Sequence, residues 1–152
     1  MSATTFPGEV SRESYVDKSA WPRSGEWNDE PDRVEWRARG FAALIVRGPS
    51  GALCGYVGVE PGHPWHGVPY ERVDAEAHGG LTYSNHCAGE ICHVPQPGEG
   101  DAVWWLGFDC AHCYDLMPAF DTHRHSEYRS LAYVRREVEK LARQAHDAAV
   151  AK

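Results

Sequence analysis

The sequence lacks the features that would place the protein in a membrane, outside the cell or on a nucleic acid. No apolar run approaches the ~20 residues that a membrane-spanning helix needs. The first nine residues lack the basic and apolar regions of a signal peptide. Fifteen basic residues stand against twenty-two acidic ones, and the net charge of −7 argues against a nucleic-acid polymer as a partner. We therefore expect a soluble, cytoplasmic protein with no membrane among its partners.

Several common functional motifs are also missing. There is no P-loop, G-x-S-x-G, H-E-x-x-H or G-x-G-x-x-G, and no internal repeat. The chain is instead rich in histidine and tryptophan, with nine and six residues respectively. Histidine transfers protons and binds metals or phosphates near neutral pH, and tryptophan supplies stacking faces as well as core volume. This composition points to a functional site without naming it.

The length of 152 residues is that of a single domain, and its elements predict an α+β fold. Prolines and glycines interrupt residues 1–40, which we expect to form an irregular, tryptophan-containing arm docked on the body. Residues 41–109 are expected to be mainly β, and residues 126–149 to form a long helix capped by Ser126 or Asp121. The prediction is a small antiparallel sheet with this C-terminal helix packed on one face.

The strands are predicted from alternation and turn residues. Residues 41–47 and 52–59 flank G-P-S-G and are expected to form a hairpin; further strands are expected at 80–84, 91–94 and 102–108. The apolar strand residues should share one core with the apolar face of the helix. This predicted core consists of Leu44, Val46, Leu53, Val57, Leu106, Phe108, Leu131, Val134, Val138 and Leu141.

The stretch V-W-W-L-G-F-D-C-A-H-C-Y-D at 103–115 sets bulky apolar residues against reactive ones. Strand parity places Trp105, Gly107 and Asp109 on one face, where they could form a stacking plate, a gap and an acceptor. The alternative is that Trp105 packs under the N-terminal arm while Asp109 caps a turn. Asp109, His112 and Asp115 also suit a carboxylate that orients an imidazole.

The second candidate stretch is E-A-H-G-G-L-T at 76–82. Its two glycines let the backbone approach a ligand closely beside an imidazole, although the same letters also suit a plain turn. We expect His78 and His112 to approach one cavity with Trp105 in its wall. The candidate ligand-binding residues are His78, Gly79, Thr82, Trp105, Asp109, His112 and Asp115.

Five cysteines raise the question of zinc. Cys87 and Cys92, together with Cys110 and Cys113, have a spacing that a four-cysteine site would accept. Buried free cysteine is common, however, and reduced thiols are the default in the cytoplasm. We expect zinc to be absent or dispensable, and we predict neither a metal site nor a cofactor.

A set of motifs resembles one family over residues 21–143. The motifs are G-E-W-N-D-E-P-D-R-V-E-W, L-I-V-R-G-P-S-G-A-L-C-G-Y-V-G-V-E-P-G-H-P-W-H-G, H-G-G-L-T-Y-S, I-C-H-V-P, W-W-L-G-F-D-C-A-H and Y-R-S-L-A-Y-V-R-R-E-V-E-K-L-A. They are similar to those of small hypothetical proteins encoded by bacteriophages and prophages. The resemblance implies a phage accessory protein in the host cytoplasm, a class that includes counter-defence factors, and it carries over no catalytic residue. The family usually has small residues where this chain has Cys113 and Tyr114, which weakens the case for a four-cysteine site.

Three functions remain open from the sequence. The first is a module that binds and sequesters a small nucleotide-like ligand, such as a host defence signal, in a His/Trp/Asp pocket. The second is a hydrolase of such a ligand, with or without a metal, in which His78 or His112 is the base and Asp109 or Asp115 orients it. The third is an inhibitor that binds a host protein through the tryptophan-containing arm or the basic segment at 124–143. Association with a second copy of the chain is also open.

Overall fold

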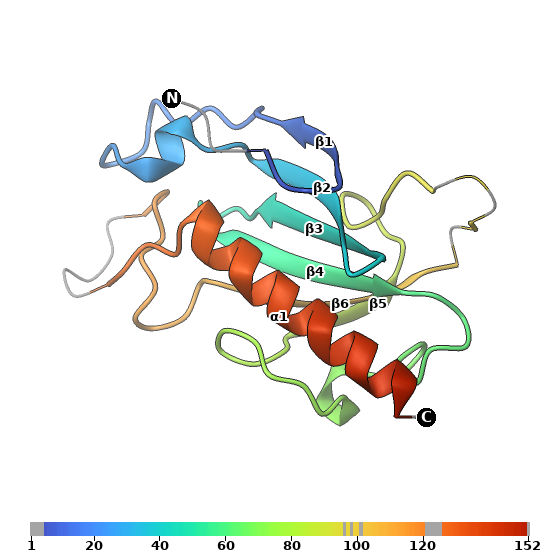
Figure 1. Ribbon diagram of the computed structural model, residues 1–152. Coiled ribbons are helices and arrows are strands. Elements are labelled where there is room, and N and C mark those ends of the chain that lie inside the picture. The colour runs from blue at the N-terminus through green and yellow to red at the C-terminus, as the bar shows by residue number, and fades with distance from the viewer. Residues whose placement is uncertain (1–4, 96, 98, 101, 121–125, 152) are drawn as a thin grey trace.

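The protein is an α+β fold in which one antiparallel sheet carries one long helix, as the sequence predicts. The structure is a computed structural model, and it describes residues 5–95, 97, 99–100, 102–120 and 126–151. Its sheet has the strand order β1-β2-β3-β4-β6-β5, and every neighbouring pair is antiparallel (Figure 1). The strands are β1 (Glu9–Glu13), β2 (Arg33–Ala38), β3 (Phe41–Arg47), β4 (Leu53–Val59), β5 (Tyr83–His86) and β6 (Trp104–Asp109).

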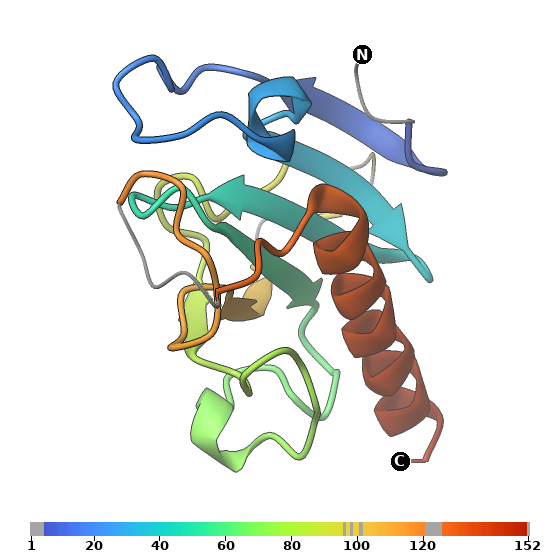
Figure 2. The same cartoon turned by 90° about the vertical axis from the view of Figure 1, so that its left-hand side faces the viewer.

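The remaining elements are helical. Helix α1 (Leu131–Val150) crosses one face of the sheet, and Figures 1 and 2 show it lying over the central strands. Two short 3-10 helices, η1 (Glu26–Asp29) and η2 (Tyr70–Arg72), lie in the connections. No helix among the described residues is long and apolar enough to cross a membrane.

The β3–β4 hairpin matches its prediction closely. Residues 41–47 form β3 as expected, and β4 begins at Leu53, one residue later than expected. Gly51 in the connecting turn has a φ of +86°, a conformation that glycine adopts without steric cost. The residues of the G-P-S-G turn therefore determine locally how β3 pairs with β4.

The N-terminal 40 residues are not the irregular arm that we predicted, because they contribute β1 and β2 to the sheet. In β2, the apolar residues Val34, Trp36 and Ala38 are buried and alternate with charged ones. This period of two is a strand signal. The prolines and glycines on both sides of it obscured the signal in the sequence.

Two other strand predictions also need correction. The strand expected at 80–84 is β5 and begins only at Tyr83, and the one expected at 102–108 is β6, shifted by one to two residues. Residues 91–94 form no strand. Ile91 makes only an isolated bridge with Ala88, in a tight turn that Cys87 and Cys92 close with a disulfide.

Helix α1 begins at Leu131 rather than at residue 126. Ser130 is the cap: its hydroxyl accepts a hydrogen bond from the backbone N–H of Tyr133 at 3.2 Å. Ser126 is therefore not the cap, and the other predicted cap, Asp121, lies outside the described residues. The chain before the helix is held extended because Glu127 pairs with the backbone of residues 114–116. Tertiary pairing thus delays the start of the helix.

The sheet buries both of its faces, and this divides the core that we predicted as one. Eight of the ten predicted core residues lie in the cluster between the sheet and α1, but Leu44 and Val46 lie in a second cluster on the opposite face. In β3, Ala43 and Ile45 point to the helix instead. A continuous apolar run such as F-A-A-L-I-V is typical of a strand that is covered on both sides. The second cluster contains Ala42, Leu44, Val46, Tyr56, Val103 and Trp105.

Candidate functional site

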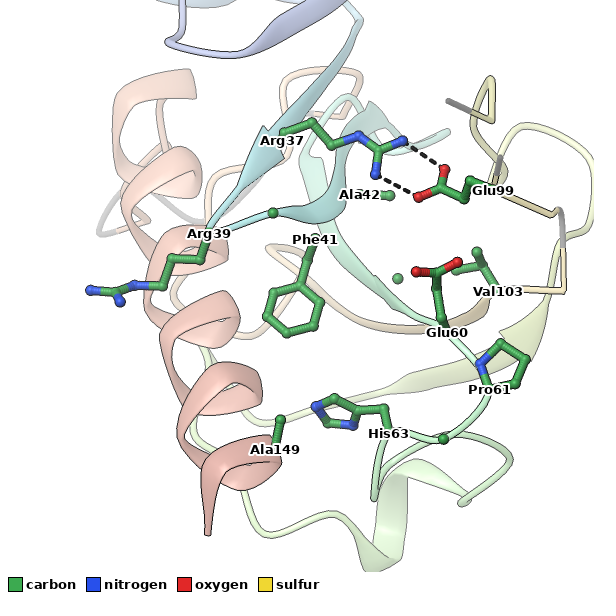
Figure 3. A pocket seen from close by; sticks show the side chains of 13 residues that line it. Arg37, Arg39, Phe41, Ala42, Glu60, Pro61, His63, Glu99, Val103 and Ala149 are labelled. Carbon is green, nitrogen blue, oxygen red and sulfur yellow. Dashed lines mark hydrogen bonds and ion pairs between the residues drawn. The ribbon is translucent and has the colours of Figure 1, made fainter. Parts of the chain in front are cut away.

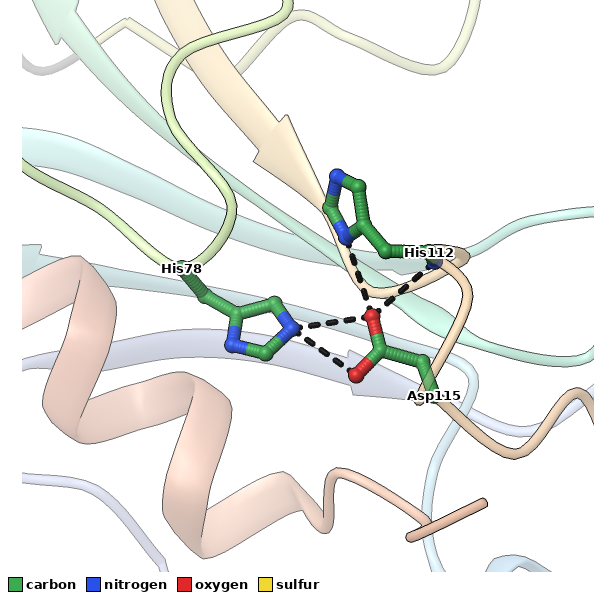
Figure 4. Close-up of side chains that lie close together, drawn as sticks. All are labelled: His78, His112 and Asp115. Atoms are coloured by element: carbon green, nitrogen blue, oxygen red, sulfur yellow. Dashed lines mark hydrogen bonds and ion pairs between the residues drawn. The ribbon is translucent and has the colours of Figure 1, made fainter. Parts of the chain in front are cut away.

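The candidate site is built around Asp115, a carboxylate in the loop that follows β6. Its side chain is only 2% exposed, and each of its oxygens accepts hydrogen bonds. Oδ1 accepts from Nε of Arg129 at 2.8 Å, and Oδ2 accepts from the backbone N–H of His112 at 3.0 Å. Both oxygens lie 2.9 Å from Nε2 of His78, and Oδ2 lies 2.9 Å from Nδ1 of His112 (Figure 4). We call these residues, together with Tyr133, the Asp115 cluster.

The cluster keeps Asp115 ionised. Burial by itself raises the pKa of this carboxyl group, but hydrogen bonds from Arg129, His78 and His112 outweigh it and lower the pKa to about 2. An ionised carboxylate only accepts hydrogen bonds. Nδ1 of His112 and Nε2 of His78 must therefore each carry a hydrogen, and these N–H groups donate hydrogen bonds to Asp115.

The two imidazoles differ in what remains available to a ligand. Nδ1 of His78 lies 2.7 Å from the hydroxyl of Tyr133, so both ring nitrogens of His78 have protein partners. Nε2 of His112 lies 3.5 Å from an oxygen of Asp109, and the side chain of His112 is 35% exposed. A neutral His112 with its proton on Nδ1 has a lone pair on Nε2. His112 is therefore the residue of the cluster that can accept a proton from outside.

Three separate segments of the chain meet here. The loop before β5 carries His78, the loop after β6 carries His112 and Asp115, and the start of α1 carries Tyr133. The rings of His78 and His112 are 5.4 Å apart, so the proximity that we expected for these two residues is present.

The contact between residue 79 and His112 explains why a glycine follows His78. A Cβ at this position would lie 2.3 Å from Cε1 of His112, and the residue has a φ of +70°. Both the space and the backbone conformation therefore require glycine. The sequence suggested that this backbone approaches a ligand, whereas in the structure it approaches the imidazole of His112.

Thr82 and Asp109 lie beside the cluster. The hydroxyl of Thr82 donates to Oδ2 of Asp109 at 3.1 Å, and Oδ1 of Asp109 accepts from the backbone N–H of Ala111. Asp109 therefore caps the turn after β6, as one of our two alternatives held. Because it also faces Nε2 of His112, it remains within reach of anything that His112 binds.

Trp105 does not join the cluster. It is fully buried in the second apolar cluster, with its ring centroid 5.6 Å from that of His93. The gap that Gly107 leaves in the strand is filled by Tyr56, because a Cβ on Gly107 would lie 2.2 Å from the Tyr56 ring. The stacking slot of Trp105, Gly107 and Asp109 is thus occupied by the protein itself, and the expectation of Trp105 in the cavity wall was wrong.

Arg129 and Tyr133 are parts of the cluster that the sequence analysis did not single out. In the sequence, Arg129 stands out only as one cation of the basic segment at 124–143. It is now an ion-pair partner of a buried carboxylate, and its pKa is raised by the hydrogen bond to Asp115. Both residues lie in the Y-R-S-L-A-Y motif, but nothing in its spacing points to a role beside Asp115. Their placement depends on how the start of α1 docks against the 110–116 loop.

Two further histidines and two tryptophans have structural roles. His63 contacts the carbonyl of Ala145 at 2.8 Å and His66 that of Ala102 at 2.9 Å, so both fasten the loop after β4. Trp27 and Trp36 are buried, so neither is available to a partner protein. Two of the three tryptophans of this segment thus contribute to the core, and Trp21 is half-buried.

The cysteines do not form the four-cysteine arrangement. Cys87 and Cys92 are joined by a disulfide, which also departs from the reduced thiols that we expected. Cys110 is buried, and burial raises the pKa of its thiol, while Cys113 is exposed. A different set of donors could hold a metal ion: His78, His112 and Asp115 offer ligand atoms within 4.8 Å of one another. Arg129 already neutralises this carboxylate and would compete with a cation.

Compared with protein-family models, with curated proteins and with solved structures, the chain gives no match. The site must therefore be interpreted from its own chemistry.

Proposed function

We propose that the protein is a hydrolase in which His112 is the general base and Asp115 orients it. One observation carries the proposal: Asp115 engages both the backbone N–H and Nδ1 of His112, which directs the unprotonated Nε2 away from the carboxylate. A buried carboxylate that fixes the tautomer of a partly exposed imidazole is the arrangement used in general-base catalysis.

The proposed reaction moves one proton through His112. Nε2 of His112 takes a proton from a water molecule as the water oxygen attacks the substrate, and the imidazolium that forms is stabilised by ionised Asp115. The bond between the attacked atom and the leaving group then breaks, and the imidazolium gives the water-derived proton to the leaving group. General-base assistance of this kind contributes about 10²- to 10⁴-fold in rate. His78 and Arg129 act as positioning residues, since each holds Asp115 through a direct hydrogen bond.

The proposed substrate is a small nucleotide-like molecule. Trp105 is buried, so a base would need a different stacking face. Tyr114 is 73% exposed and lies between His112 and Asp115 in the same loop. Aromatic rings of this kind stack on nucleobases without selecting among them. Turnover of a signalling nucleotide would fit the counter-defence role implied by the resemblance to phage proteins.

The test compares two histidines that each lie beside an aspartate. The purified protein is incubated with a panel of mononucleotides, cyclic dinucleotides and dinucleotides, with and without added divalent cations. We expect turnover that His112→Gln reduces by about 10²-fold or more. His146→Gln is the matched control, because His146 lies 3.6 Å from Asp147 on the exposed end of α1 and should leave turnover unchanged.

Two results would overturn the proposal. The first is full activity of His112→Gln, and the second is no turnover of any member of the panel. In the second case, saturable binding of a nucleotide by the same protein would favour the sequestering module, the other use of this site. The exposed ring of Tyr114, two residues from His112 in the same loop, is the observation that supports such binding.

A further inference from the structure

We infer that a groove between the β2–β3 turn and helix α1 is a binding site for a small ligand that carries two or more phosphate groups. The groove has a volume of about 500 Å³ and is separate from the Asp115 cluster, with which it shares no residue. We call it the basic groove. Its lining residues are Pro7, Arg37, Ala38, Arg39, Arg136, Glu139, Lys140 and Arg143.

The helix contributes a row of three cations. Arg136, Lys140 and Arg143 follow one another at steps of four and three residues, which places them on one exposed face of α1. Lys140 contacts Glu137 at 3.2 Å. Within the part of the chain that the structure describes, Arg136 and Arg143 have no carboxylate partner.

The opposite side of the groove is marked by Arg39, whose backbone conformation is unusual. Arg39 and Gly40 form the two-residue turn between β2 and β3, and both have positive φ, 51° for Arg39 and 82° for Gly40. Asparagine and glycine suit this turn, whereas arginine is disfavoured in the left-handed region. Figure 3, which draws a neighbouring pocket that also includes Arg39, shows its side chain extending away from Phe41. Arg39 lines the basic groove together with residues of α1. The chain thus places a long cation at a position where a small residue would fit better.

The acidic and basic residues around the groove are paired in a way that leaves its positive charge uncompensated. Arg37 is held by Glu99 through two hydrogen bonds of 2.9 and 2.8 Å (Figure 3). The acidic lining residue, Glu139, is held by Arg135 at 3.0 Å. Three guanidinium groups without a carboxylate partner among the described residues therefore face the groove, in a protein whose net charge is −7.

The guanidinium groups and the size of the groove both favour a small ligand with several phosphate groups. The planar guanidinium donates paired hydrogen bonds that match a phosphate group, and several such groups suit a ligand with several phosphates. The volume of the groove lies in the range of small-molecule sites. A nucleic-acid polymer would need a wider positive footprint than this acidic protein offers. The chemistry thus favours an oligophosphate or a nucleoside polyphosphate.

Inorganic triphosphate is the probe, and isothermal titration of the full chain at low and moderate salt is the measurement. We expect one site per chain. Because a charge-assisted hydrogen bond contributes enough for about tenfold in affinity, the double variant R136Q/R143Q should weaken binding at least tenfold. Arg72→Gln is the matched control, since it removes an exposed cation from η2, outside the groove, and should change affinity less than twofold.

Arg39→Gly separates binding from folding. Glycine relieves the disfavoured backbone conformation, so this variant should melt at the same temperature as the wild type or higher while losing about tenfold in affinity. Unchanged affinity in Arg39→Gly would overturn the inference, as would no saturable binding at millimolar triphosphate. Equal losses of affinity in Arg72→Gln and Arg39→Gly would also overturn it, because they would show that triphosphate responds to the overall charge of the protein and not to the groove. Tighter binding of a single-stranded oligonucleotide than of triphosphate would replace the small ligand with a polymer.

Discussion

Replacing Asp115 by asparagine should destabilise the protein in a pH-dependent way. The lowering of the Asp115 pKa from 3.8 to about 2 corresponds to about 2 kcal/mol of stability at neutral pH. Asparagine offers one oxygen where the carboxylate offers two, so it leaves Arg129 or an imidazole N–H facing another donor. Breaking a buried, hydrogen-bonded ion pair adds to the loss, and we expect about 2–4 kcal/mol at pH 7.

The sign of the pH dependence follows from the direction of the shift. Because the pKa of Asp115 is depressed in the folded state, its contribution is complete above the unfolded pKa near 4 and is lost as the pH falls toward 2. The contribution of about 2 kcal/mol at pH 7 should fall to about half at pH 3. Other carboxylates titrate alike in both proteins, so the gap between wild type and variant isolates this group.

The assay is urea-induced unfolding of both proteins at pH 7, 4 and 3, followed by tryptophan fluorescence. Asp147→Asn serves as the control, because Asp147 is 67% exposed and should show little loss at any of these pH values. A gap that stays constant from pH 7 to pH 3 would refute the reasoning, since the stabilisation would then not depend on the charge of Asp115. So would a variant as stable as the wild type.

Two further predictions concern the backbone and the thiols. Gly79→Ala should lower the melting temperature and abolish any activity of the site, because its Cβ would lie 2.3 Å from the His112 ring at a φ of +70°. An alanine variant with wild-type stability would show that the two segments do not pack as described. Alkylation of the denatured, unreduced protein should modify three of its five cysteines, since Cys87 and Cys92 are bonded to each other. Modification of all five, measured by mass spectrometry, would contradict the disulfide.

The sequence by itself determined the elements whose signals are local. Turn residues and alternation predicted the β3–β4 hairpin, and steps of three and four residues predicted α1. Since these signals arise from neighbours along the chain, an α+β fold follows from them directly. The same reasoning failed for β2, in which apolar and charged residues alternate from Val34 to Ala38. Because prolines and glycines lie on both sides, this segment was predicted to be part of an irregular arm.

Tertiary structure decided which residues meet. Strand parity separates two faces but does not say which one the helix covers, so Leu44 and Trp105 were assigned to the wrong neighbours. The convergence of His78 with His112 could be proposed from chemistry, but Arg129 carries no sequence signal for its part in it. It contacts Asp115 because the segment just before α1 lies beside the loop after β6. Such contacts depend on long-range packing, which no local pattern encodes.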